Sequence, residues 1–102
     1  MTFRIYKHKR NMADIARRTG YKPREYTPQG ELNCVRPIHG DYPRFHIYMK
    51  EDHSDGKEVL VFNLHLDQKK PSYEGATAHS GDYESDVVKE EAERIKNILF
   101  ED

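Results

Sequence analysis

Residues 44–67, RFHIYMKEDHSDGKEVLVFNLHLD, decide the fold that this sequence predicts. Apolar and polar side chains alternate in both halves of the stretch, and a period of two is typical of strands with one buried face. The middle, DHSDG at 52–56, has the composition of a turn. Strands joined by a short turn pair antiparallel, so we expect a β-hairpin with strands at 44–50 and 58–67.

The alternation also assigns the side chains to the two faces of the hairpin. The apolar side chains that we expect on the buried face are Phe45, Ile47, Met49, Leu60, Phe62, Leu64 and Leu66. With the hairpin loop centred near 54–55, His46 is predicted opposite Asn63, and Arg44 opposite His65. Both histidines would then project from the other, open face of the sheet.

A third strand is predicted at 32–36, before the turn-like segment HGDYP at 39–43. Together with the hairpin it makes a β-meander over residues 31–67. Cys34 belongs to the more apolar side of this strand, so we expect it in the core. If Val35 faced the core instead, Cys34 would join the histidines on the open face.

The C-terminal part of the chain predicts an amphipathic helix at 85–99, capped by Ser85. Its apolar stripe, which we expect to pack on the buried face of the sheet, comprises Val88, Ala92, Ile95 and Leu99. Residues 68–84 connect the sheet to this helix and show neither the period of two of a strand nor the period of a helix. This predicts a long loop, and loops of this length are often functional.

Residues 1–30 read as a basic N-terminal arm with a short helix that begins at Asn11. Two prolines and a glycine in 21–30 favour a loop or a linker. The length of 102 residues, of which 35% are hydrophobic, suits one core. We therefore predict a single α+β domain over 1–102: a three- to four-stranded antiparallel meander, packed on one face by the C-terminal helix, with a short N-terminal helix.

Composition counts against several classes of protein. No apolar run approaches the length of a membrane helix, the start lacks the apolar segment of a secretory signal, and one cysteine excludes an internal disulfide. These features favour the cytoplasm. Residues 1–50 contain eleven Lys and Arg against four Asp and Glu, a net +7, whereas residues 51–102 contain six against fourteen, a net −8. This asymmetry indicates either a basic docking surface or attraction between two copies.

The sequence favours a binding module over an enzyme, with RNA or another polyanion bound by the basic half of the chain. Lys and Arg neutralise phosphates, and aromatic rings stack on unpaired bases. The residues that we expect to make these contacts are Arg10, Arg17, Arg18, Lys22, Arg24, Arg44 and Tyr48. The sequence pI of 6.6 counts against a dedicated nucleic-acid binder.

The alternative is a metal-dependent hydrolase. His-x-Asp on a strand places His65 and Asp67 on one side, and His46 and His79 are candidates for further ligands. Imidazole and carboxylate groups suit zinc or manganese. The same residues also suit a hydrogen-bonded polar sheet face without a metal. A third hypothesis is a structural protein that forms homo-oligomers through exposed sheet edges.

Overall fold

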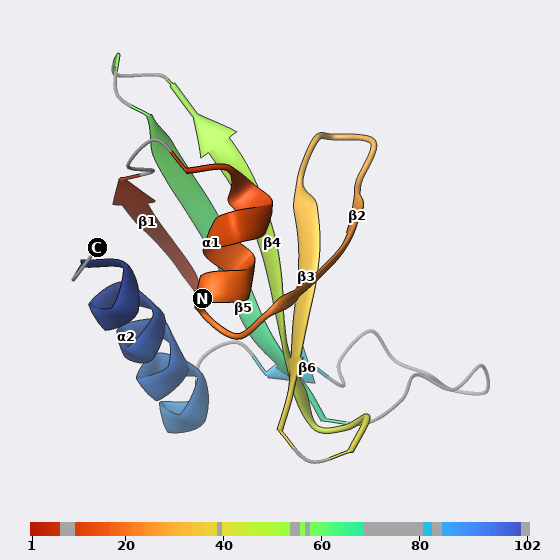
Figure 1. Cartoon of the computed structure of the whole chain (residues 1–102). Helices are drawn as coiled ribbons and strands as arrows, with labels where there is room; N and C mark the ends of the chain where they lie inside the picture. The colour runs from red at the N-terminus through yellow and green to blue at the C-terminus, as the bar shows by residue number, and fades with distance from the viewer. Residues whose placement is uncertain are drawn as a thin grey trace.

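The computed structural model in Figure 1 describes residues 1–6, 10–38, 40–53, 56, 58–68, 81–82 and 85–100. The elements, in chain order, are β1 (Thr2–Tyr6), α1 (Met12–Arg18), β2 (Lys22–Tyr26), β3 (Leu32–Pro37), β4 (Arg44–Asp52), β5 (Val59–Asp67), β6 (Gly81–Asp82) and α2 (Asp86–Phe100). The α+β class and both helices are confirmed. Neither helix of this described part of the chain is long and apolar enough to cross a membrane.

The sheet is larger than the meander that the sequence predicts. Five antiparallel strands lie in the order β1-β5-β4-β3-β2, and the two-residue β6 pairs with the end of β5. The prediction of three to four strands was therefore wrong. Strands β1 and β2 extend the predicted meander at its two edges, and β2 lies in a segment that the sequence marks as a loop or a linker.

The sequence pattern does not predict strand β2 because β2 is an edge strand. Four of its five residues are exposed, so its sequence shows no alternation of apolar and polar side chains. Pro23 lies in the strand, and the register shifts between Pro23 and Glu25. Edge strands tolerate proline and bulges because one side of the strand has no partner to accept from or donate to.

The hairpin of β4 and β5 has the predicted faces but a different register. His46 lies opposite His65, and Arg44 lies opposite Asp67. The last pair before the turn is Asp52 with Val59, so the loop is centred one residue later than expected. This moves every cross-strand partner by two residues, and a two-residue shift leaves each side chain on its predicted face.

The core lies between the sheet and the two helices. The seven apolar side chains assigned to the inner face of the hairpin are all buried, as are Cys34 and the four predicted stripe residues of α2. Helix α1 contributes Met12, Ile15 and Ala16 to the same cluster. Both helices therefore cover one face of the sheet, with α1 beside β2 and β3 and α2 beside β5 and β1 (Figure 1). The histidines of β4 and β5 are left on the opposite face.

Candidate metal centre

The candidate site lies on the open face, where the start of β4 and the end of β5 bring polar side chains into adjacent cross-strand rows. His46 and His65 form one row, and the next row pairs Arg44 with Asp67. Residues directly opposite each other on antiparallel strands have neighbouring side chains. Two imidazoles and one carboxylate consequently meet at one point of the sheet.

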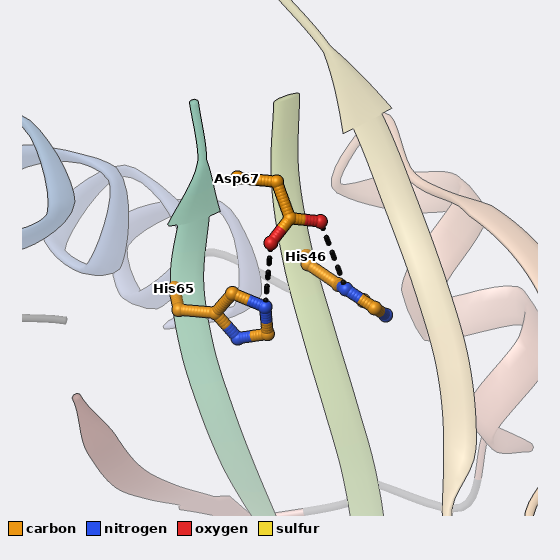
Figure 2. A group of neighbouring side chains, drawn as sticks. All are labelled: His46, His65 and Asp67. Atoms are coloured by element: carbon orange, nitrogen blue, oxygen red, sulfur yellow. Dashed lines mark hydrogen bonds and ion pairs between the residues drawn. The ribbon is translucent and has the colours of Figure 1, made fainter. Parts of the chain in front are cut away.

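The two histidines both contact the Asp67 carboxylate, one at each oxygen (Figure 2). Nδ1 of His46 lies 3.2 Å from Oδ2, and Nε2 of His65 lies 3.0 Å from Oδ1. One ligand atom from each of the three side chains lies within 4.8 Å of the other two. The imidazole ring centroids are 4.7 Å apart.

The three side chains are largely withdrawn from water, with 11%, 9% and 19% of the side-chain surface of His46, His65 and Asp67 exposed. Burial by itself raises the pKa of the Asp67 carboxyl. Hydrogen bonds and positive charge from His46 and His65 outweigh burial, and the pKa lies well below its usual range. The carboxylate is therefore ionised at every physiological pH.

Arg44 borders the site on the side of Asp67. Its Nε lies 3.3 Å from Oδ2 of Asp67, in hydrogen-bonding position. Its guanidinium carbon lies 4.6 Å from the centroid of the Tyr42 ring, a cation–π arrangement that holds the group in place. Oδ2 of Asp67 is thus shared between a guanidinium and an imidazole.

A second polar contact orients His46 from the other side of its ring. Nε2 of His46 faces the side-chain oxygen of Asn33 on β3. The amide nitrogen of Asn33 donates in turn to Glu25 on β2, at 3.5 Å, which fixes the oxygen of the amide toward His46. A hydrogen-bonded chain therefore crosses four strands, from Glu25 through Asn33 and His46 to Asp67.

Sequence reasoning missed Asn33 and Glu25. Asn33 stands between Leu32 and Cys34, two core residues, so the alternation places its side chain on the open face. That signal was available. The contact of Glu25 depends on β2, whose existence the sequence does not reveal.

Each of the three side chains offers one ligand atom, and together they could hold a metal ion. Tetrahedral zinc with bonds of ~2.0–2.1 Å holds neighbouring donor atoms roughly 3.3 Å apart. The two separations between ring nitrogen and carboxylate oxygen, 3.2 and 3.0 Å, are close to that value and equally suit hydrogen bonds to the two oxygens of Asp67. A ligand histidine commonly donates its other ring N–H to an oxygen, as His46 can to Asn33.

Of the four metal ligands that the sequence proposes, the structure brings His46, His65 and Asp67 together. The fourth, His79, lies outside the described residues. Cys34 faces the core and not the histidines, as expected, although its neighbour Val35 is buried as well.

The residues proposed for polyanion binding lie on both sides of the sheet. Arg44 and Tyr48 alternate with the core residues of β4 and so lie on the open face. Lys22 shares that face, because it pairs with Val35, which pairs with His46. Tyr48 packs its ring beside those of both histidines, at centroid distances of 4.7 and 6.2 Å.

The other basic residues of that set lie elsewhere. Arg17 and Arg18 are exposed on α1, which packs on the opposite face, and Arg17 lies 3.5 Å from Asp14. Arg10 precedes α1, and Arg24 is exposed at the β2 bulge. The structure does not bring these seven side chains together on one face.

No protein-family model, curated protein or solved structure matches this chain. The function of the site consequently has to be argued from its own residues. Their types and mutual distances are such that they could hold a metal ion.

Proposed function

We propose that this protein binds a divalent transition metal ion, zinc or manganese, through His46, His65 and Asp67 and acts as a metal-dependent hydrolase. The observation that carries the proposal is the convergence of two imidazole nitrogens on the two oxygens of one carboxylate. Neutral imidazole and carboxylate are the ligand types that these ions accept.

The protonation of the cluster suits this role. Asp67 is already ionised, so only the protons between the ring nitrogens and the carboxylate must leave when the ion enters. The ion then replaces two hydrogen bonds with two nitrogen ligands. The hydrogen bond from Nε2 of His46 to Asn33 is kept, because it lies on the far side of the ring.

Three protein ligands leave coordination positions for water and substrate, which distinguishes catalytic from structural zinc sites. A bound divalent ion lowers the pKa of its water to about 7 and supplies a hydroxide at neutral pH. Held by His46, His65 and Asp67, the ion would supply this hydroxide as the nucleophile of a hydrolysis, in which the bond to the leaving group would break and the leaving group would take up the proton released by the water.

The other two hypotheses have less support. The basic residues assigned to polyanion binding are divided between the open face and α1, so no single surface gathers them. RNA binding therefore stays a prediction. Homo-oligomer formation through the sheet edges stays a prediction too. The ligand geometry on the open face favours the metal centre over both.

The test is metal binding by tag-free protein that has been stripped with a chelator. Zinc and manganese chloride are titrated separately by calorimetry, and unfolding temperatures are measured with and without each ion. We expect one ion per chain. At 100 times the dissociation constant the gain is about 2.7 kcal/mol, and for a domain of this size each kcal/mol raises the unfolding temperature by roughly 4–8 °C.

Matched variants locate the site. His65→Ala and His46→Ala should abolish the rise in unfolding temperature. His53→Ala should keep it, because His53 is an exposed histidine that pairs with Glu51 away from the cluster. If neither ion shifts the unfolding temperature, or if His65→Ala binds as tightly as the original protein, the proposal is wrong.

A further inference from the structure

The contacts of Arg44 engage only one of the hydrogen-bonding nitrogens of its guanidinium group. Its Nε faces Asp67, and its guanidinium plane rests near Tyr42. Within the described part of the chain, this contact through Nε accounts for its hydrogen bonding. Among the described residues, no acceptor faces the two terminal nitrogens with their four N–H groups, and 24% of the side chain is exposed.

The position of these donors relative to the ligand set is the decisive point. Oδ2 of Asp67 contacts both Nε of Arg44 and Nδ1 of His46. A metal ion held by His46, His65 and Asp67 would therefore lie one carboxylate oxygen away from the guanidinium. A tetrahedral oxyanion spans such a gap, with one oxygen on the metal and another on the guanidinium fork.

The charges of the site favour a doubly charged anion. The divalent ion and Arg44 contribute three positive charges, Asp67 removes one, and the two ligand imidazoles are neutral, which leaves a net charge of about +2. A phosphate monoester carries a charge of about −1.5 to −2 at neutral pH. Monoanionic carboxylates and uncharged esters would compensate this charge less well.

We infer that the substrate of the metal centre is a phosphate monoester and that Arg44 donates hydrogen bonds to the phosphate beside the ion. This inference rests on the proposed metal-dependent function and names its substrate. In the binding geometry a phosphate oxygen occupies an open coordination position of the metal. The terminal nitrogens of Arg44 donate to a second phosphate oxygen.

The experiment uses the full chain, loaded with whichever of zinc or manganese binds in the titration above, and inorganic phosphate as the probe. Phosphate binding is measured by calorimetry with the loaded and the stripped protein. We expect binding to the loaded protein only. Arg44→Gln should weaken phosphate binding about 10- to 100-fold, the value of hydrogen bonds to a charged group. Acetate at the same concentrations should compete poorly.

Two further variants keep this test interpretable. Arg44→Lys preserves the charge beside Asp67 but loses the planar fork, so its phosphate affinity should fall between those of the original protein and Arg44→Gln. Arg4→Gln also breaks an ion pair with an aspartate, Asp52, on β4, and should leave phosphate binding unchanged.

The outcomes separate the inference from the function on which it rests. Absence of metal binding overturns both. Metal binding without phosphate binding, or equal phosphate affinity for the original protein and Arg44→Gln, overturns the inference and leaves the metal centre in place.

Discussion

The hydroxyl of Tyr21 donates a 2.6 Å hydrogen bond to Oε2 of Glu91, which lies 70 residues later in α2. Arg94 donates to both oxygens of the same carboxylate, at 2.7 and 2.9 Å, and to the backbone oxygen of Thr19 at 2.6 Å. Arg36 of β3 lies 3.6 Å from Oε1 of Glu91. These contacts join α2 to the end of α1 and to the sheet. They hold the two helices on the face of the sheet opposite the candidate site.

The first prediction concerns this cluster. Burial and the charge of Glu91 raise the pKa of Tyr21 far above its usual value, so its hydroxyl remains a donor. Tyr21→Phe should lower the free energy of unfolding by about 1–2 kcal/mol, because Glu91 keeps its bonds to Arg94. Glu91→Gln should cost more, about 2–4 kcal/mol, because Arg94 and Arg36 lose their counter-charge.

Urea denaturation measures both effects. Glu90→Gln is the matched control, because Glu90 is the exposed neighbour of Glu91 on the same helix, and it should change stability by less than about 0.5 kcal/mol. Equal stabilities of Glu90→Gln and Glu91→Gln would show that the cluster does not fasten the helix.

The second prediction concerns Cys34. Its side chain is fully buried, and burial raises the pKa of the thiol to about 12. Only the thiolate reacts, so a disulfide reagent at pH 8 should modify Cys34 at the rate at which the sheet opens. In denaturing urea the reaction should finish within the mixing time of a manual assay. Fast modification of the folded protein would contradict the observed packing of β3.

The alternation in residues 44–67 predicts which side chains share a face but not which ones are partners. Phe45 and Phe62 are buried and His46 and His65 share the open face, as the period of two requires. The register depends on the geometry of the turn, and the sequence of a loop specifies this only weakly. For that reason the pairing of His46 with His65 was missed.

The candidate site shows the same limit. His46, His65 and Asp67 could be proposed from one strand pattern, because all three lie on β4 and β5. The alternation in β3 places Asn33 on the open face, whereas Glu25 reaches the site from β2 through long-range pairing that the local sequence does not encode. Glu91 is buried although it is charged, because Tyr21, which follows α1, and Arg36 of β3 reach it from distant parts of the sequence.

The third prediction concerns acid stability. Hydrogen bonds from His46 and His65 keep the pKa of Asp67 well below its usual value in the folded protein, whereas the unfolded chain has a value of about 3.9. Above about pH 4 the Asp67 carboxyl is ionised in both the folded and the unfolded protein. Its interactions with the histidines then add about 2 kcal/mol to the free energy of unfolding. As pH falls below about 4, the unfolded chain binds the proton first and this benefit is lost.

Asp67→Asn tests this prediction, because the amide has the shape of the carboxylate without its charge. The difference in the free energy of unfolding between the two proteins should be constant from about pH 6 to pH 4.5 and should shrink toward pH 2.5. Urea denaturation in metal-free buffer measures it. A difference that does not vary with pH would mean that Asp67 is not held ionised by the histidines.

The fourth prediction concerns Asn33. Its side-chain oxygen faces Nε2 of His46 and accepts the proton of Nε2, so that Nδ1 is left as the metal ligand once the ion has displaced the proton between Nδ1 and Asp67. Partners of this kind typically change metal affinity 10- to 100-fold when they are removed. Asn33→Ala should therefore weaken zinc or manganese binding by about that factor, whereas Asn33→Asp should retain it, because a carboxylate accepts the same proton.

Asn63→Ala is the matched control for this last measurement. Asn63 lies on β5, on the same face, opposite Tyr48 and two residues before His65, but it is exposed. Its removal should leave the dissociation constant of the metal unchanged. If Asn33→Ala and Asn63→Ala bind the ion equally well, the orientation of His46 does not depend on the chain of hydrogen bonds from β2 and β3. The ligand set would then be positioned by β4 and β5 alone.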